Sequence, residues 1–258
     1  MTRSVAVYRR RVAASELRVW ENVLDWEHLP WLHRHAFRSL ERLETERPGW
    51  RVRTALAGGD EIVVELETFR EASRYVVRTI EGAGQGTEIW TQVAAVAPRA
   101  TDVEVAFHVP ALVPEARDPV GRGYVALYTR LWDEDEAMMV RRQEVLDRGL
   151  LRARPAPGAG LGSAAELRAS APRVVEAQGV PLRVVLVDGE LWAHSFVCPH
   201  RGGPLQETTD DPTCVRCPWH GYRFDVRSGR SADGRVPALA YARRLEIDAR
   251  GEARLPAE

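Results

Sequence analysis

The first pattern along the chain is an alternation of apolar and polar residues over residues 4–12, which is typical of a β-strand. Leu17, Trp20 and Leu24 then recur at spacings of three and four, as on one face of a helix. We therefore expect a strand at the start of the chain, followed by a helix over residues 14–35.

Five more strand-like segments follow this helix, each separated from the next by turn residues. They cover residues 50–57, 61–69, 74–81, 87–96 and 101–109. The helical pattern returns over residues 120–148. Helices at both ends of an antiparallel meander predict an α+β domain in which the sheet wraps onto a long helix, with a cavity between them.

The last third of the chain shows only short strand-like segments, which predict a small all-β sandwich or barrel. They cover residues 173–178, 181–187, 190–197, 222–225, 239–247 and 253–255. Residues 151–166 are rich in Pro, Gly and Ala and show no periodicity, so we expect a linker there. The predicted domains are therefore residues 1–150 and 167–258.

The composition is that of an ordinary globular protein, with 45% hydrophobic and 28% charged residues and a formal net charge of −1. Nothing in this balance predicts a nucleic acid or an anionic membrane as partner. The apolar runs are far shorter than the ~20 residues of a membrane-spanning helix, and the first residues lack the apolar block of a secretory signal. Three cysteines bunched between positions 198 and 217 favour a metal site over disulfides, and with it a cytoplasmic location.

Two short segments of the second domain carry a metal-ligand pattern. They read Cys198-Pro-His200 and Cys217-Pro-Trp-His220, with sixteen residues between His200 and Cys217. Two thiolates and two neutral imidazoles can hold a [2Fe–2S] cluster, with sulfur ligands on one iron and nitrogen ligands on the other. The alternative is a zinc site that uses Cys214 instead of Cys198, because Cys214-Val-Arg-Cys217 is itself a zinc spacing. That alternative leaves the first segment unexplained.

The two segments resemble the ligand loops of the Rieske family, and the resemblance covers about residues 168–256. It implies a [2Fe–2S] cluster as cofactor, with Cys198, His200, Cys217 and His220 as its ligands. The zinc alternative would make Cys214 a ligand, whereas the resemblance leaves it as a bystander.

The same resemblance bears on the reduction potential of the cluster. Respiratory Rieske proteins carry an extra cysteine in each loop, where this chain has Gly203 and Trp219. They also carry a serine and a tyrosine that donate hydrogen bonds to cluster sulfurs, where this chain has Tyr222 and Phe224. Fewer donors favour the oxidised state, so the implied potential is about −150 mV, as in ferredoxins and oxygenases.

A second candidate metal site lies in the predicted first helix. Asp25 and His28 are three residues apart and share a helix face, whereas His28 and His33 are five apart and would stand about 140° out of line. Pro30 removes a backbone N–H between the two histidines and loosens the turn, so that His33 can swing round. A carboxylate would complete an iron(II) triad, and Asp135 lies in the apolar stripe of the late helix.

Several assignments stay open around this site. The histidines could be ordinary packed side chains, with His35 as a spare. Asp133, with Glu136 three residues later, is expected to cap a helix start, although Asp133 is also the alternative to Asp135 as ligand. Glu134 is expected to point elsewhere, and His108 and His194 lie in strand-like segments, where a structural role is expected.

Asn22, Asp25, His28 and His33 form the pattern Asn-x-x-Asp-x-x-His-x-x-x-x-His. This pattern resembles the mononuclear-iron motif of Rieske non-haem iron oxygenases of the ring-hydroxylating α-subunit type. The resemblance implies a helix-grip (START/Bet v1-like) catalytic domain with Asp135 as third iron ligand. It also places Asn22 and Asp25 among the catalytic residues, with Asp25 linking the two metal centres. Family members carry these two domains in the opposite order.

The expected function is that of an oxygenase component with two cofactors, a [2Fe–2S] cluster and a mononuclear Fe(II), which oxidises a small apolar or aromatic substrate with O2. The chain shows no nucleotide-binding glycine fingerprint, so the electron donor is expected to be a separate NAD(P)H-dependent reductase or ferredoxin. The family resemblance also implies a homotrimer. The alternative is a Rieske ferredoxin-like electron carrier or sensor, fused to an iron-free ligand-binding helix-grip domain.

Overall fold

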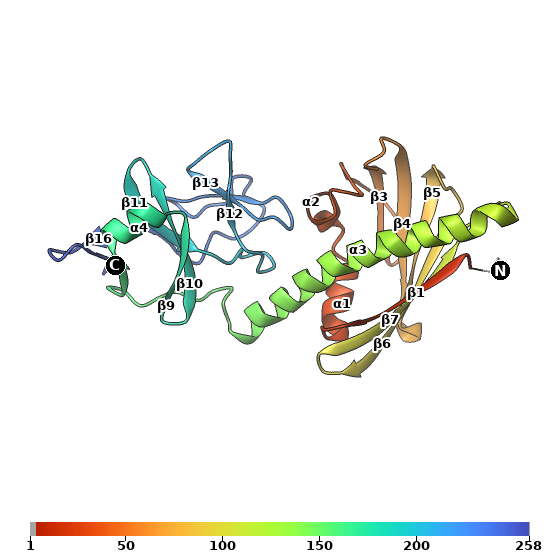
Figure 1. Cartoon of the computed structure of the whole chain (residues 1–258), viewed down its shortest axis with the longest axis horizontal. Helices are drawn as coiled ribbons and strands as arrows, with labels where there is room; N and C mark the ends of the chain where they lie inside the picture. Colours follow the sequence, from red (N-terminus) through yellow and green to blue (C-terminus); the bar gives the residue numbers. More distant parts are fainter. Residues whose placement is uncertain (1–3, 258) are drawn as a thin grey trace. The chain divides into compact units, whose positions relative to one another are not determined.

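The computed structural model describes residues 4–257 and divides into two compact units, residues up to 140 and residues from 141 (Figure 1). Residues 1–3 and 258, which the expected domains include at their outer ends, lie outside the described residues. No helix within residues 4–257 is long and apolar enough to cross a membrane.

The first unit is built on one antiparallel sheet of seven strands in the order β1-β7-β6-β5-β4-β3-β2. The strands are β1 (Ala6–Val12), β2 (Glu41–Leu43), β3 (Gly49–Ala55), β4 (Glu61–Phe69), β5 (Arg74–Gly82), β6 (Glu88–Ala97) and β7 (Ala100–His108). The long helix α3 (Pro114–Asp147) crosses one face of this sheet with the part that belongs to the first unit (Figure 1). This arrangement confirms the expected helix-grip fold.

Alternation along the strands decides which face of the sheet meets the helix. Trp50 and Val52 of β3 are buried and belong to the core of the first unit. Phe107 of β7 packs directly on α3, with ring centroids 5.0 Å from Tyr124 and 4.8 Å from Tyr128. Aromatic contacts of this kind fix the helix against the sheet.

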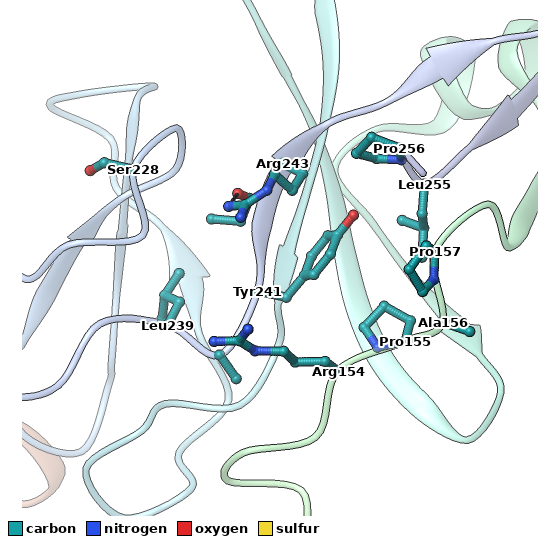
Figure 2. A pocket seen from close by; sticks show the side chains of 12 residues that line it. Arg154, Pro155, Ala156, Pro157, Ser228, Leu239, Tyr241, Arg243, Leu255 and Pro256 are labelled. Atoms are coloured by element: carbon teal, nitrogen blue, oxygen red, sulfur yellow. Dashed lines mark hydrogen bonds between the residues drawn. The ribbon is translucent and has the colours of Figure 1, made fainter. Parts of the chain in front are cut away.

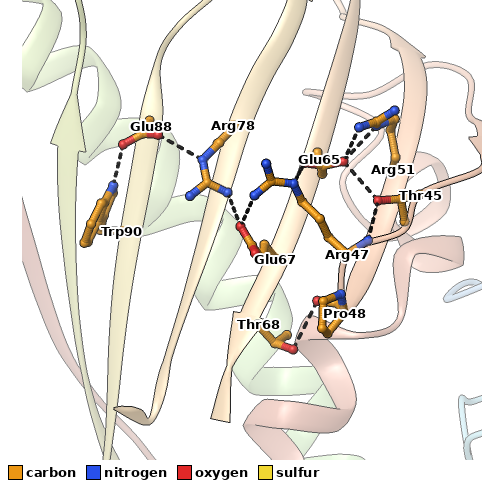
Figure 3. A network of polar contacts seen from close by, with 10 residues as sticks. All are labelled: Thr45, Arg47, Pro48, Arg51, Glu65, Glu67, Thr68, Arg78, Glu88 and Trp90. Atoms are coloured by element: carbon orange, nitrogen blue, oxygen red, sulfur yellow. Dashed lines mark hydrogen bonds and ion pairs between the residues drawn. The ribbon is translucent and has the colours of Figure 1, made fainter. Parts of the chain in front are cut away.

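The opposite face of the sheet carries a network of ion pairs (Figure 3). Glu65 of β4, whose side chain is 2% exposed, lies 3.1 Å from Arg47 and 2.8 Å from Arg51. Glu67 accepts hydrogen bonds of 2.6 Å from both Arg47 and Arg78. A buried carboxylate is costly unless it is paired, so these arginines allow acids on this face. The main apolar core of the first unit therefore lies on the helix side.

The predicted helix over residues 14–35 is wrong beyond its first two turns. The segment instead contains α1 (Glu16–Val23), the 3₁₀ helix η1 (Trp26–His28) and the short helix α2 (Leu29–Leu32). The chain leaves the helical conformation at Asp25, with φ −91° and ψ 84°. Pro30 stands in the first turn of α2, where its missing N–H would have no helical partner.

The late helix begins at Pro114, before the expected residue 120, and contains Pro119. Pro119 is the sixth residue of the helix and removes one backbone hydrogen bond, yet the helix continues through it. Asp133 consequently lies inside α3 and is not a cap, contrary to expectation. It pairs instead with Arg10 of β1 at 2.5 Å, and Glu136 pairs with the same guanidinium at 2.7 Å.

The second unit is all β apart from the end of α3 and the short helix α4 (Ala164–Ser170), as expected. Its sheets have the strand orders β15-β11-β10-β9, β12-β13-β14 and β16-β17-β8. The strands are β8 (Gly160–Ser163), β9 (Arg173–Ala177), β10 (Val180–Val187), β11 (Glu190–Ser195), β12 (Gln206–Glu207), β13 (Cys214–Arg216), β14 (Arg223–Asp225), β15 (Ala242–Arg244), β16 (Glu246–Ile247) and β17 (Glu252–Arg254).

The linker expected over residues 151–166 is shorter in the structure. Its last part forms β8, which pairs with β17, and Ser163 then caps α4. Gly160 and Gly162 occupy β8, so this strand has no apolar alternation by which it could be recognised.

Two histidines lie in strands, as expected. His108 ends β7 and meets Trp90 edge-on, with ring centroids 5.8 Å apart. His194 of β11 is fully buried, and its Nδ1–H donates to the carbonyl of Ser195 at 2.9 Å. Burial lowers the pKa of His194 to about 4, so the folded chain holds this ring neutral.

The buried His194 predicts a loss of stability in mild acid. Unfolded histidine titrates near pH 6.5, so the stabilisation by the neutral ring is complete above that pH and is lost as the pH falls toward 4. Between pH 8 and pH 5 this loss is roughly 2 kcal/mol. We expect denaturant unfolding of His194→Gln to show a smaller loss over the same range. An equal loss in both proteins would contradict the assignment.

Candidate metal centres

The two cysteine–histidine loops of the second unit share one backbone design. The N–H of Cys198 and that of Cys217 each donate to the carbonyl of the fifth residue after them, at 2.8 Å in both loops. The N–H groups of Gly202 and Gly221 donate back to the respective cysteine carbonyls at 2.9 Å. These two glycines have φ angles of 87° and 71°, which other residues rarely adopt. Each loop is therefore closed by its own backbone.

These loops bring the four expected cluster ligands together. The thiols of Cys198 and Cys217 are buried and hydrogen-bonded to each other. The rings of His200 and His220 meet edge to face, with centroids 4.5 Å apart. Two sulfur and two nitrogen donors in facing pairs form the donor set of a [2Fe–2S] cluster with mixed ligation.

Cys214 lies outside this group. Its thiol is hydrogen-bonded with Asp211 and Arg223, and burial raises its pKa. Within residues 4–257, the set of three residues whose ligand atoms lie within 4.8 Å of one another is His28, His33 and Asp135 of the first unit, and it includes no cysteine. The thiol of Cys217 is hydrogen-bonded to Cys198, whereas that of Cys214 is bonded to Asp211 and Arg223, so the geometry favours Cys198 rather than Cys214 as the partner of Cys217.

The two buried thiols share a proton. The hydrogen bond with Cys217, together with burial, raises the pKa of Cys198, whereas the same bond lowers the pKa of Cys217 to about 5. Backbone N–H groups of His200 and Arg201 bond to the sulfur of Cys198, and that of Trp219 bonds to the sulfur of Cys217. Such donors stabilise thiolates, which are the form of cysteine that binds iron.

Gly203 of the first loop packs against Trp219 of the second. By the resemblance to the Rieske family, these are the two positions at which respiratory members carry an extra cysteine. A Cβ on Gly203 would lie 2.6 Å from Sγ of Cys217 and 3.0 Å from the indole of Trp219. Cys198, Cys214 and Cys217 are all free thiols. Among the described residues no disulfide joins the two loops, and close packing holds them together.

In the first unit, His28, His33 and Asp135 converge. Oδ1 of Asp135 lies 3.4 Å from Nε2 of His28 and 3.0 Å from Nε2 of His33. One ligand atom of each residue lies within 4.8 Å of the others, and both rings are buried. Two imidazoles and one carboxylate are the ligand set of non-haem Fe(II) oxygenases, so these residues suit such an ion.

The break after α1 is what aims the two histidines. His28 ends η1 and His33 follows α2, with Pro30 between them. An unbroken helix would hold the two side chains about 140° apart, whereas their ring centroids lie 5.1 Å from each other. Asp135 comes from α3, beside Trp132 of the core, so three separate segments meet at the site.

Asn22 and Asp25 also lie at this site. Nδ2 of Asn22 donates to Oδ1 of Asp135 at 2.9 Å, and Oδ2 of Asp25 lies 4.0 Å from Nδ1 of His28. Burial raises the pKa of Asp135, but the charge and hydrogen bond of His33 outweigh it and lower that pKa overall. Burial lowers the pKa of His33, and the nearby carboxylates more than reverse this. The nearby carboxylates thus favour the protonated form of His33, and His33 favours the ionised form of Asp135.

The sequence analysis missed Glu134, which does not point away from the site. Its Oε2 lies 2.7 Å from Nδ1 of His33. Consecutive helix positions differ by about 100°, so Glu134 and Asp135 can reach the two ring nitrogens of His33. The position of Glu134 next to the predicted ligand Asp135 was the sequence feature from which its role could have been predicted. His35 lies outside the ligand group, with its Nδ1 3.5 Å from Oε1 of Glu134.

A cavity of about 440 Å³ adjoins the triad, between the sheet and α3. Its walls are mainly apolar and aromatic, and none of the described residues that line it is an arginine. The aromatic members are Phe37, Trp50, Tyr75, Tyr124, Tyr128 and Trp132. Ligand sites of proteins typically combine such walls with a few polar groups at one end.

A second cavity, of about 370 Å³, lies within the second unit (Figure 2). Tyr241 stands in it between Arg154 and Arg243, with Pro155 and Pro157 along one side (Figure 2). None of the residues expected to act in the function lines this cavity.

Comparisons with known proteins bear on the second unit first. Residues 160–243 match the family model of the Rieske [2Fe-2S] domain. This segment is a Rieske domain. A relative in Mycobacterium tuberculosis, the oxygenase component of 3-ketosteroid-9-alpha-monooxygenase, is 38% identical over 108 residues, which are 41% of this chain and 26% of that protein. Apoptosis-inducing factor 3 of human is 36% identical over 67 residues, which are 25% of this chain and 11% of that protein. The chain thus spans about a quarter or less of these relatives.

Similar solved structures cover about half of the chain. A START superfamily protein from Mycobacterium smegmatis has a TM-score of 0.42 at 17% identity, covering 52% of this chain and 97% of its own. The Zhui aromatase/cyclase of a Streptomyces species has a TM-score of 0.44 at 15% identity, covering 54% of this chain and 94% of its own.

The contact between the two Rieske loops predicts a sharp sensitivity at Gly203. We expect Gly203→Ala to lose most of its cluster, because the added methyl would stand 2.6 Å from Sγ of Cys217. Iron, acid-labile sulfide and the visible absorption of the purified protein measure this. Gly160→Ala, whose Cβ would meet nothing within 4 Å, and Cys214→Ser should both keep the cluster. Loss of the cluster in Cys214→Ser would show that the ligand assignment is wrong.

Proposed function

We propose that the chain is a Rieske-type oxygenase component, which passes electrons from a [2Fe–2S] cluster to a mononuclear non-haem iron for O2-dependent oxidation of a small apolar substrate. Cys198, His200, Cys217 and His220 would hold the cluster. The observation that carries the proposal is the convergence of His28, His33 and Asp135 beside an apolar cavity, in a chain that also contains a Rieske domain.

The triad residues would hold Fe(II) at the inner end of the cavity. When bound there, an iron ion with this ligand set supplies the O2 chemistry, and the cluster supplies electrons one at a time. Asn22 would keep Asp135 oriented through its 2.9 Å hydrogen bond. The rings of His28 and His33 are buried, so bulk water is kept from the ligand atoms.

The cavity supports a neutral, apolar or aromatic substrate. Apart from the iron itself, a carboxylate-bearing substrate would lose its hydration without gaining an arginine as partner, because none is among the described lining residues. The oxygenase component that is 38% identical over 108 residues acts, by its name, on a 3-ketosteroid, which is also a neutral apolar molecule. This relative supports the reaction class.

The electron donor would be a separate protein, an NAD(P)H-dependent reductase or a ferredoxin, since the chain has no dinucleotide fingerprint. Asp25 would link the two centres by accepting hydrogen bonds from a histidine on each. A closed ring of three chains is the proposed assembly, in which Asp25 of one chain faces His200 or His220 of the next.

Metal content separates this proposal from its alternative, an electron carrier or sensor with an iron-free ligand-binding domain. We expect three irons per chain after anaerobic purification. His28→Ala and Asp135→Ala should each remove one iron and abolish turnover while the cluster spectrum stays, because a three-ligand site that loses one ligand binds metal poorly. Asp133→Ala, which changes an acid paired with Arg10 in the same helix turn, is the matched control. Two irons in the unaltered chain would support the carrier, and zinc would rule out both.

Asp25→Asn tests the proposed link between the centres. The variant should keep three irons but reoxidise its reduced cluster much more slowly in a single turnover, because one amide oxygen cannot bridge two imidazole N–H groups as a carboxylate does. Unimpaired reoxidation would overturn the bridge. Sedimentation checks the assembly separately, and an active monomer would overturn the trimer alone.

A further inference from the structure

Both histidines of the triad turn the same edge toward Asp135. Each presents Nε2 to that carboxylate, so that each Nδ1 faces away from the candidate iron position. A histidine that binds a metal through one nitrogen needs its proton on the other, and a hydrogen bond at that second nitrogen selects this tautomer. The groups at the two Nδ1 atoms therefore matter for the site.

The two Nδ1 atoms have unequal surroundings. Asp25 lies 4.0 Å from Nδ1 of His28, beyond hydrogen-bond distance. Glu134 lies 2.7 Å from Nδ1 of His33, which is a short and strong hydrogen bond to a carboxylate. The His33 ring is thus held between Asp135 at one edge and Glu134 at the other, from consecutive positions of α3.

Glu134 is itself held in place. Its Oε1 lies 3.4 Å from Nε of Arg130, one helix turn earlier, and 3.5 Å from Nδ1 of His35. The Glu134 side chain is 27% exposed, whereas that of His33 is 2% exposed. The carboxylate can therefore stay hydrated on one side while it accepts a hydrogen bond from the buried ring on the other.

We propose that Glu134 is a positioning residue of the iron site, which accepts the Nδ1–H of His33 and thereby makes Nε2, the nitrogen that faces Asp135, the one that binds the metal. The inference rests on the proposed function in so far as that function places iron at the triad. Glu134 does not itself reach the ligand position. Its effect is to select one tautomer and one orientation of a ligand.

The test compares Glu134→Ala with Glu134→Gln and with Asp133→Ala in the full chain with its cluster loaded. The dissociation constant for Fe(II), added anaerobically, should rise about 10- to 100-fold in Glu134→Ala. Glu134→Gln should bind Fe(II) more tightly than Glu134→Ala, because its amide oxygen still accepts from Nδ1–H. Asp133→Ala removes the same charge from the neighbouring residue and should leave Fe(II) affinity unchanged. Wild-type affinity in Glu134→Ala would overturn the proposal.

A second measurement does not depend on metal binding. Nitrogen-15 NMR of labelled histidines in the metal-free site, at a pH where His33 is neutral, reports which ring nitrogen carries the proton. Glu134 and Asp135 compete for the one proton of the neutral ring, so we expect a larger fraction of the Nδ1–H form in the unaltered chain and in Glu134→Gln than in Glu134→Ala, where Asp135 alone accepts at Nε2. An unchanged tautomer in Glu134→Ala would overturn the role of Glu134. If the unaltered chain binds no Fe(II), the proposed function fails, and the tautomer measurement still decides this inference.

Discussion

The first unit depends on the pairing of the Asp135 carboxylate, whose side chain is 13% exposed. Asp135 lies at the edge of an apolar cavity, where an unpaired charge would cost several kcal/mol. Its partners are Asn22, His28 and His33, which come from α1, η1 and the residue after α2. These partners can reach Asp135 only if the chain leaves helical geometry near residue 25. The irregular stretch between α1 and β2 is therefore a consequence of the site, and the straight helix α3 supplies the fixed point to which it is bonded.

The strands of the first unit could be predicted because one face of the sheet is apolar and the other is charged. In β4, Val64 and Leu66 face the cavity while Glu65 and Glu67 face arginines, so residues 64–67 alternate between apolar and charged, whereas Val63 before them is apolar and buried as well. β8 could not be found in this way, since glycines fill its alternate positions. The start of α3 was misplaced because the helical pattern was identified only from residue 120, after Pro119, although the helix begins at Pro114 and continues through that proline.

The candidate sites were predictable to different depths. The cluster loops are local, so spacing alone identifies Cys198 and Cys217, and the backbone bonds within each loop explain why such short segments suffice. The triad joins residues about a hundred positions apart. Asp135 could be predicted as a ligand only because a carboxylate among the apolar positions of a helix face is unusual unless it has a function. No comparable feature of the sequence distinguished Glu134. It lies on the half-exposed side of the helix, where acidic residues are common, and only the position of His33 gives it a role.

The charges around the cavity also limit what the site can accept. The carboxylates beside His33 raise its pKa, and a metal ion that binds Nε2 competes with a proton for that nitrogen. The proton and the metal are thus alternative cations for one place in the structure. Because no arginine is among the described residues that line the cavity, a substrate with its own negative charge would find no further cation there. The same pairing rule that fixes Asp135 therefore favours a neutral molecule in the cavity, oriented by shape and by aromatic contacts rather than by an ion pair.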